Sequence, residues 1–232
     1  MLMDVEEKEN QKIMNLFESD DYTTIVMDSH EQWLKERGKG IGGSDAAAVI
    51  GMSPWKSLQE LWREKKYGAE EISNYAIKYG TEAEAPLRKL FTLKHPELDV
   101  QHMDDVTLES NENRFMRYSP DGLLYDKDTG RKGILEIKTS MINSSMAYQN
   151  WKDDKVPDQY YIQTLHGLLV TKFDFVIYTA ELRFVDGSSK IIERSYQTKD
   201  VQDDLEILKN KEIEVWNEYF LADKEPPFQF DL

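Results

Sequence analysis

The spacing of the apolar positions changes along the chain. From residue 29 to residue 94 they recur at helical intervals, and between residues 98 and 138 they alternate with polar positions. Helical spacing returns over 141–154 and 158–171, and alternation returns over 173–180, 182–185 and 190–198. A last amphipathic helix is expected over 201–221. Helices and strands interleaved in this order predict one α/β domain with a mixed sheet.

The beginning of the chain differs from the rest. Residues 1–28 are acidic and weakly patterned, so we expect an N-terminal extension with a short helix over 13–17. A single domain over 29–232 follows it. Ser29 is positioned to begin the first helix of that domain, which ends before Gly38.

Three further helix signals precede the strands. The run Gly42-Gly43-Ser44-Asp45 opens a turn, with Ser44 or Asp45 as the cap of a short alanine-rich helix. The segment 57–60 reads as a capping box for a second helix. A third helix over 74–94 is interrupted by Gly80 and Pro86, which predict a kink or a restart at Thr81.

Composition excludes several kinds of chemistry. The 232 residues contain no Cys, which rules out disulfides, thiolate zinc sites, Cys-ligated iron–sulfur clusters and cysteine nucleophiles. No apolar run approaches the roughly 20 residues needed to cross a bilayer, and the first residues lack a signal-peptide pattern. We expect no membrane association, and the absence of Cys fits a protein of the reducing cytoplasm.

The net charge of −15 argues against a nucleic-acid partner, because phosphate binding usually requires a basic surface. Two arrangements would reconcile the acidic net charge with a nucleic-acid partner. A local basic groove can lie on an acidic body, and carboxylates that bind a metal count as negative until the metal is bound.

The most informative stretch is a hairpin with a turn at residues 128–130. Folding the chain about residues 128–129 sets Asp121 opposite Glu136, and Lys138 lies on the same face as Glu136 because strand side chains alternate. Asp121 and Glu136 supply hard oxygen ligands of the kind that Mg²⁺ prefers, with the carbonyl of Ile137 as a third. Lys138 is suited to orient a metal-bound water or to stabilise a charged transition state.

Each of these signals also has an ordinary interpretation. A Glu-x-Lys pair on a strand is most often a surface charge pair, and Glu84 is equally suited to close a capping box with Thr81 or to act as a third acidic ligand. Arg37 and Ser44 flank a turn into a helix, where they are suited to hold a phosphate or to act as a surface arginine and a cap. Gln163 is suited to contact the metal site or a backbone phosphate, or to be a partly buried amide. The four histidines show no ligand spacing.

Taken in order, six motifs resemble the YqaJ-type viral recombinase family, which includes phage lambda exonuclease and belongs to the PD-(D/E)xK nuclease superfamily. They lie at Arg37 with 41–48, at 51–57, at Gly80 to Glu84, at 119–122, at 136–139 and at 160–163. The resemblance covers about residues 37–171. It implies a single restriction-endonuclease-like domain with a central mixed sheet flanked by helices.

The resemblance also implies roles for individual residues. Asp121 and Glu136 match the metal carboxylates and Lys138 the catalytic lysine, while Glu84 matches the helical carboxylate of the family. Arg37, Ser44 and Ser119 match positions that hold a 5′-terminal phosphate. Gln163 matches the first glutamine of a Tyr-x-x-Gln-x-Gln pattern, whose second glutamine is Leu165 here.

The activity implied is that of a Mg²⁺-dependent 5′→3′ exonuclease, with Mn²⁺ expected to substitute. Such an enzyme digests one strand of linear double-stranded DNA to 5′-mononucleotides, and the 3′ single-stranded tail serves phage-type recombination by single-strand annealing. A ring-shaped homotrimer and a single-strand annealing protein as partner are expected by similarity. In such a ring, a locally basic region would line or approach the DNA channel, formed by Arg37, Lys39, Lys56, Arg63, Lys65 and Lys66.

Two other functions are compatible with the sequence. One is an endonuclease of the same superfamily, which would cut closed circles. The other is a catalytically inactive module that binds DNA ends, against which the presence of Asp121, Glu136 and Lys138 argues.

Overall fold

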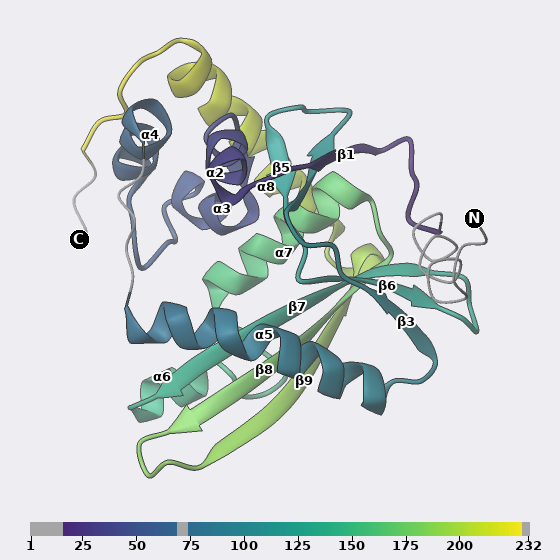
Figure 1. The fold of residues 1–232 in the computed structure, drawn as a ribbon. Coiled ribbons are helices and arrows are strands. Elements are labelled where there is room, and N and C mark those ends of the chain that lie inside the picture. The colour runs from purple at the N-terminus through teal and green to yellow at the C-terminus, as the bar shows by residue number, and fades with distance from the viewer. Residues whose placement is uncertain (1–15, 69–73, 229–232) are drawn as a thin grey trace.

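A computed structural model describes residues 16–68 and 74–228, which form two β-sheets with helices packed around them (Figure 1). The larger sheet has the strand order β3 (Leu98–Gln101), β6 (Gly122–Asp126), β7 (Lys132–Ile142), β8 (Phe175–Phe184) and β9 (Ser189–Gln197). Its strands are antiparallel except for the β7–β8 pair, which is parallel. The predicted α/β class with a mixed sheet is confirmed.

Each face of this sheet is covered by a helix. Helix α5 (Tyr75–Lys94) crosses one face (Figure 1), where Leu87 and Phe91 pack against Leu124 and Leu135. Helix α7 (Asp158–Thr171) covers the other face and contributes to the larger core cluster. The alternation of side chains along β6 and β7 supplies apolar residues to both layers.

The smaller sheet has the strand order β1 (Tyr22–Val26), β4 (Val106–Ser110), β5 (Met116–Tyr118) and β2 (Ile41–Gly42). Strand β1 lies in the segment that the sequence assigns to an N-terminal extension. It pairs with β4, and Phe17 and Tyr22 are buried in the core. The sequence pattern of this segment is weak because burial does not alternate along β1: only Tyr22 is buried, and the apolar Val26 is 65% exposed. The expected helix over 13–17 lies mostly outside the described residues.

A group of helices packs beside the smaller sheet (Figure 1). It consists of α2 (His30–Arg37), α3 (Gly43–Val49), α4 (Leu58–Tyr67), α8 (Gln202–Val215) and the π-helical segment η2 (Trp216–Leu221). A 3₁₀ turn, η1 (Thr198–Asp200), precedes α8, and a short α6 (Ser145–Gln149) follows β7. The sequence predicts a helix over 141–154. The helix is shorter, because the pairing of β7 with β8 continues to Ile142 and α6 begins only at Ser145.

Two predicted helix starts differ in the structure. Helix α3 is capped by Gly42 rather than by Ser44 or Asp45, and Asp45 lies in the first turn, where its carboxylate accepts a hydrogen bond from the Gly42 N–H. Helix α5 continues through Pro86 with no restart at Thr81, whose hydroxyl donates to the carbonyl of Ile77 one turn earlier. The predicted caps Ser29 and Ser57 are confirmed.

Within the described ranges, 16–68 and 74–228, no helix is long and apolar enough to cross a membrane.

Candidate active site

The hairpin formed by β6 and β7 has the predicted register. Gly122 lies opposite Leu135, so the next position along each strand brings Asp121 opposite Glu136. Glu136 is only 1% exposed. Its Oε1 accepts a hydrogen bond from Gln163 Nε2 at 2.5 Å and lies 2.5 Å from Lys138 Nζ, and its Oε2 accepts from the Tyr118 hydroxyl at 2.8 Å. The expected grouping of Asp121, Glu136 and Lys138 is therefore present in the structure.

Asp121 is held through both its carboxylate and its backbone carbonyl. Its Oδ2 accepts a hydrogen bond from the N–H of Ile137 at 2.7 Å. Its carbonyl oxygen accepts one from Arg88 Nε at 2.8 Å and lies 3.1 Å from His102 Nδ1. These contacts fix the carboxylate immediately before the start of β6, next to Glu136.

Glu84 reaches the same place from helix α5. Its carboxylate pairs with Arg88, the residue one turn later, at 2.5 Å. Arg88 thus links Glu84 to the backbone of Asp121, and the charge of Glu84 acts on the Asp121 carboxylate. The structure brings Glu84 to the edge of the acidic site, as predicted, but engages it in an ion pair.

The electrostatics of the site favour an added cation. Burial raises the pKa of Glu136 to about 7, and the nearby Asp121 carboxylate adds to the rise against the opposing effect of Lys138. Burial, together with Glu84, also raises the pKa of Asp121. Burial opposes ionisation of Lys138, but Glu136 and Asp121 outweigh it and raise the pKa of the lysine.

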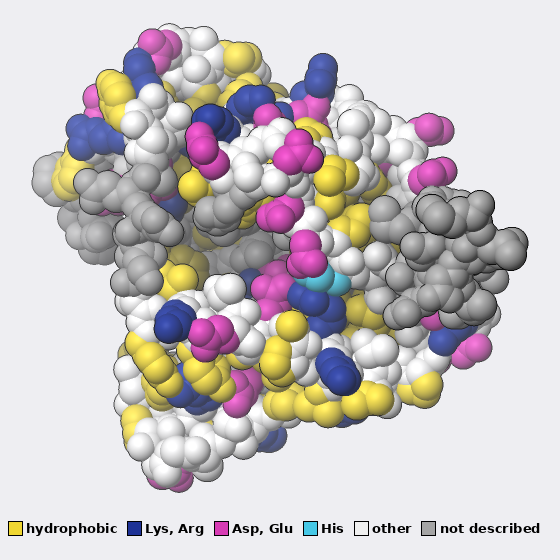
Figure 2. Space-filling view, in the orientation of Figure 1, with side chains coloured by type: hydrophobic (Ala, Val, Ile, Leu, Met, Phe, Trp, Pro, Cys, Tyr) yellow, Lys and Arg dark blue, Asp and Glu magenta, His cyan; other side chains and the backbone are white. Residues whose placement is uncertain are grey.

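The donor chemistry of this site fits a hard divalent cation, because Asp121 and Glu136 present carboxylate oxygens side by side and each disfavours the charge of the other. In the described part of the chain, however, no three Asp, Glu, His or Cys side chains converge closely enough to form a ready metal cage. Glu84 pairs with Arg88 and Glu136 with Lys138. Figure 2 shows acidic side chains in the middle of this face, beside Lys and Arg side chains and a hollow between the upper helices and the sheet.

A pocket of about 150 Å³ adjoins the acidic site. All four residues predicted to bind phosphate line it: Arg37, Ser44, Ser119 and Gln163. Arg37 Nη2 donates to the Ser44 hydroxyl at 2.8 Å, and the Ser119 hydroxyl lies 2.9 Å from that of Thr107. A guanidinium, hydroxyl groups and the first turn of α3 together suit a phosphate group.

The pocket and the acidic site share two side chains. Tyr118 and Gln163 line the pocket and also donate hydrogen bonds to Glu136. Gly43 allows this close approach, since a Cβ there would lie 3.1 Å from the Tyr118 ring and 3.2 Å from Gln163 Cγ. The pocket therefore lies one side chain away from Glu136.

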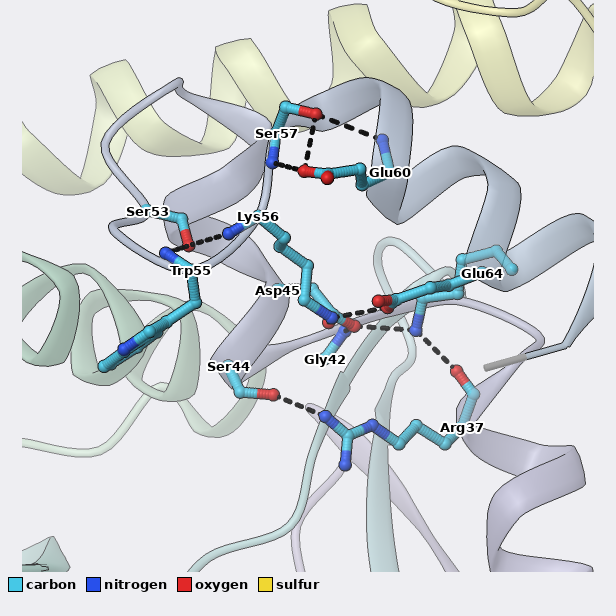
Figure 3. A network of polar contacts seen from close by, with 11 residues as sticks. Arg37, Gly42, Ser44, Asp45, Ser53, Trp55, Lys56, Ser57, Glu60 and Glu64 are labelled. Carbon is cyan, nitrogen blue, oxygen red and sulfur yellow. Dashed lines mark hydrogen bonds and ion pairs between the residues drawn. The ribbon is translucent and has the colours of Figure 1, made fainter. Parts of the chain in front are cut away.

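A buried ionic network supports the pocket from behind (Figure 3). Asp45, 1% exposed, lies 2.6 Å from Lys65 Nζ and 3.8 Å from Lys56 Nζ. Lys65 also donates to the carbonyl of Arg37 at 2.7 Å. Burial opposes ionisation of Asp45, but Lys65 and Arg37 outweigh it and lower the pKa of the carboxyl. The network thus connects α3, α4 and the end of α2, which carries Arg37.

The basic region predicted before Gly68 is largely neutralised. Five of its six cations pair with carboxylates, namely Lys39 with Glu36, Lys56 with Glu64, Arg63 with Glu225, Lys65 with Asp45 and Lys66 with Asp223. Arg37 instead bonds to the Ser44 hydroxyl. Arg37 is therefore the cation of this region that the structure directs into the pocket.

The sequence did not reveal the part that three residues play in the site. Tyr118 immediately precedes the 119–122 motif, but an apolar strand position gave no reason to single it out. Arg88 lies one helical turn after Glu84, a spacing that predicts an ion pair. Lys65 belongs to the predicted basic region, but its pairing with Asp45 has no local signal, because Asp45 is twenty residues earlier and only the packing of α4 on α3 brings the two together.

Solved structures share this fold. An alkaline exonuclease (LHK-Exo) from Laribacter hongkongensis is 20% identical, with a TM-score of 0.58 over 83% of this chain and 96% of that one. A structure of LHK-Exo in complex with dAMP is 21% identical, with a TM-score of 0.56 over 83% of this chain and 98% of that one. A phage related exonuclease from Haemophilus somnus 129PT is 14% identical, with a TM-score of 0.50 over 80% and 96%. These likenesses confirm the restriction-endonuclease-like fold.

The sequence also has relatives. The Uncharacterized protein YqaJ of Bacillus subtilis (strain 168) is 29% identical over 200 residues, which is 85% of this chain and 59% of that protein. The chain therefore spans less than two thirds of the length of this relative. The family model of the YqaJ-like viral recombinase domain matches residues 32–174, which include the pocket and the acidic site. The chain belongs to the YqaJ-like viral recombinase domain family.

Proposed function

We propose that this protein is a Mg²⁺-dependent 5′→3′ exonuclease that digests one strand of linear double-stranded DNA. The observation that carries the proposal is the shared wall between the pocket and the acidic site. Gln163 and Tyr118 line the pocket, and both donate hydrogen bonds to Glu136 in the acidic site. A phosphate bound in the pocket places the next phosphodiester of the same strand beside Glu136, so cleavage starts at a strand end.

The pocket residues act on the terminal phosphate. The Arg37 guanidinium pairs with it, and the hydroxyls of Ser44 and Ser119 donate hydrogen bonds to its oxygens. Arg37 is already directed by Ser44, so little rearrangement is needed on binding. A strand that begins with a hydroxyl lacks this anchor and is expected to be a poorer substrate.

The acidic residues act at the bond that is cut. Asp121 and Glu136 would hold Mg²⁺, with Glu84 and the carbonyl of Ile137 as further ligands. Bound there, the ion would make water more acidic and neutralise charge on the phosphate. Lys138, with its ammonium 2.5 Å from Glu136 and 5.2 Å from the centre of the Tyr160 ring, supplies a positive charge to the pentacovalent transition state.

The relatives support a nuclease. Two of the proteins whose structures share the fold are named as exonucleases, one alkaline and one phage related, and the alkaline exonuclease has also been solved in complex with dAMP. We propose by family similarity that the chain forms a homotrimeric ring, uses Mn²⁺ in place of Mg²⁺, and works with a single-strand annealing protein in recombination. A DNA substrate of this kind places the protein in the cytoplasm of a bacterial or phage-infected cell.

A digestion assay tests the proposal. The purified protein is incubated with linear duplex carrying a 5′-phosphate, in Mg²⁺, in Mn²⁺ and in EDTA. We expect 5′-mononucleotides and a 3′ single-stranded tail in both metals and no digestion in EDTA. Closed circular duplex is the matched control and is expected to remain intact.

Three results would contradict the proposal. Cutting of the closed circle would favour an endonuclease. Tight binding to duplex ends without turnover in either metal would favour an inactive end-binding module. Undiminished digestion in EDTA would exclude the proposed role of the carboxylates.

A further inference from the structure

An exposed tryptophan lies next to the candidate active site. Trp55, in the loop between α3 and α4, is 63% exposed. Single exposed apolar side chains are common on protein surfaces and need no explanation by themselves. Trp55 differs from them in two respects, the rigidity of its loop and the identity of the side chains beneath its ring.

The loop is held in place on both sides of Trp55 (Figure 3). The Ser53 hydroxyl accepts hydrogen bonds from the backbone N–H groups of Trp55 at 3.2 Å and Lys56 at 3.3 Å. The Lys56 ammonium then pairs with Glu64 at 2.5 Å and reaches toward the buried Asp45. The backbone that carries the exposed indole is therefore fixed by the same network that supports the pocket.

The indole also lies close to the candidate catalytic lysine. Its ring centre is 5.9 Å from that of Tyr160, a residue of α7, and Lys138 Nζ is 5.2 Å from the Tyr160 ring. Trp55 and Lys138 thus both lie next to the same aromatic ring. Tyr160 also packs against the buried Trp151, with ring centres 5.9 Å apart, so it provides firm support for Trp55.

Helix α3 connects this aromatic surface with the phosphate pocket. Ser44 lies in the first turn of α3 and lines the pocket, and the loop with Trp55 follows the end of the same helix. A nucleotide whose phosphates occupy the pocket and the acidic site must project its base toward a neighbouring surface. The exposed and supported indole is suited to receive a base, because aromatic rings stack on any base regardless of sequence.

We propose that Trp55 is a base-stacking residue, whose indole packs against a nucleobase of the strand being degraded. This inference rests on the proposed function, since it requires DNA in the site. It assigns binding of the base to Trp55 and binding of the phosphate to Arg37 and its neighbours. Stacking of this kind positions the strand for cleavage without selecting a sequence.

A binding assay tests the inference. The fluorescence anisotropy of a labelled duplex with a 5′-phosphate is measured with Ca²⁺ in place of Mg²⁺, and a gel verifies that the strand stays intact. We expect Trp55→Ala to weaken binding about tenfold and Trp55→Phe to retain most of the affinity. Leu221→Ala removes a similarly exposed apolar side chain from η2 and is expected to bind as the wild type does.

A second substrate series identifies the base. Duplexes with an abasic nucleotide at the first, second or third position of the 5′ end are bound by the wild type and by Trp55→Ala. At the stacked position, removal of the base weakens wild-type binding about tenfold and has little effect on the variant. Additive losses at all three positions would contradict stacking.

The outcomes separate this inference from the proposed function. If the wild type does not bind duplex ends, both are wrong. If it binds and digests DNA but Trp55→Ala binds equally well, only the stacking role is wrong, and the exposed indole then serves a different contact such as a protein partner. Because Trp55 is exposed, its replacement is not expected to unfold the chain, and thermal unfolding of each variant verifies this.

Discussion

Glu136 and Asp45 make an instructive comparison. Both are carboxylates with 1% exposure, and each lies within 2.6 Å of a lysine ammonium. Their pKa values nevertheless move in opposite directions, upward for Glu136 and downward for Asp45. Burial by itself would raise the pKa of both carboxyls, so the opposite directions come from the neighbouring charges.

The neighbours of the two carboxylates differ in sign. Glu136 shares its surroundings with another acid, Asp121, and with one lysine, which leaves an excess of negative charge. Asp45 is close to Lys65, Lys56 and Arg37, which leaves an excess of positive charge. An acid-rich cluster attracts a cation and a cation-rich cluster attracts an anion, so a metal-dependent nuclease needs both kinds next to each other. The four predictions below test this contrast.

The largest effect is expected at the acid-rich cluster. Lys138→Met removes the only ammonium that pairs with Glu136 among the described contacts and should lower the rate of digestion about a thousandfold, because a charge at the transition state is lost. The rate is measured on linear duplex in Mg²⁺. Lys94→Met is the matched control, since Lys94 also pairs with a glutamate at 2.5 Å, Glu193, and should keep its activity. Equal losses of digestion rate in the two variants would show that Lys138 supports the structure and does not act on the transition state.

The next effect is expected at the cation-rich cluster, and it concerns stability. Asp45→Asn leaves Lys65 and Lys56 without their buried partner and should lower the free energy of unfolding by about 3 kcal/mol. Urea unfolding measures this change. Asp223→Asn removes the partner of Lys66 at the surface and should have little effect. A stable Asp45→Asn protein would show that the network is not needed for folding.

A smaller effect is expected for the pocket itself. Arg37→Ala should reduce the preference for 5′-phosphorylated over 5′-hydroxyl ends about 30-fold, because a charged hydrogen bond to the phosphate is lost. The ratio of initial rates on the two substrates measures this preference. Arg63→Ala, which removes an arginine paired with Glu225, provides the comparison and should leave the ratio unchanged. An unaltered ratio in Arg37→Ala would show that the 5′-terminal phosphate does not bind in this pocket.

The smallest effect concerns a third buried pair. His166 Nδ1 lies 2.9 Å from both oxygens of Glu212, and its Nε2 lies 2.9 Å from the carbonyl of Arg117. Burial opposes protonation of His166, but Glu212 outweighs it and raises the pKa of the imidazole. A raised pKa in the folded state means that the stabilisation is complete below the unfolded value of about 6.5 and is lost as pH rises through the folded value.

We therefore expect the contribution of His166 to the stability of the wild type to fall above about pH 6.5, by at most about 1.4 kcal/mol per pH unit. Glu212→Gln should lose this part of the pH dependence, because the charge that raises the pKa is gone. Urea unfolding between pH 5 and 9 compares the two proteins. The same slope in both would show that His166 does not titrate with folding.

The sequence was most informative where contacts are local. Asp121, Glu136 and Lys138 belong to one hairpin, and the turn at 128–130 together with strand alternation fixed their register. The helix caps at Ser29 and Ser57 are likewise set by neighbouring residues. The division at residue 28 did not anticipate β1, because only Tyr22 of this strand is buried and its apolar positions do not alternate regularly with polar ones.

The amino-acid sequence by itself determined the hairpin, its two carboxylates and its lysine, because a tight turn and a period of two leave only one register. The tertiary structure alone decided that Tyr118 and Gln163 join the pocket to Glu136, that Asp45 receives two lysines, and that Trp55 stays exposed beside Tyr160. These contacts connect segments far apart in the chain, and only the packing of α3, α4 and α7 around the sheets brings them within reach.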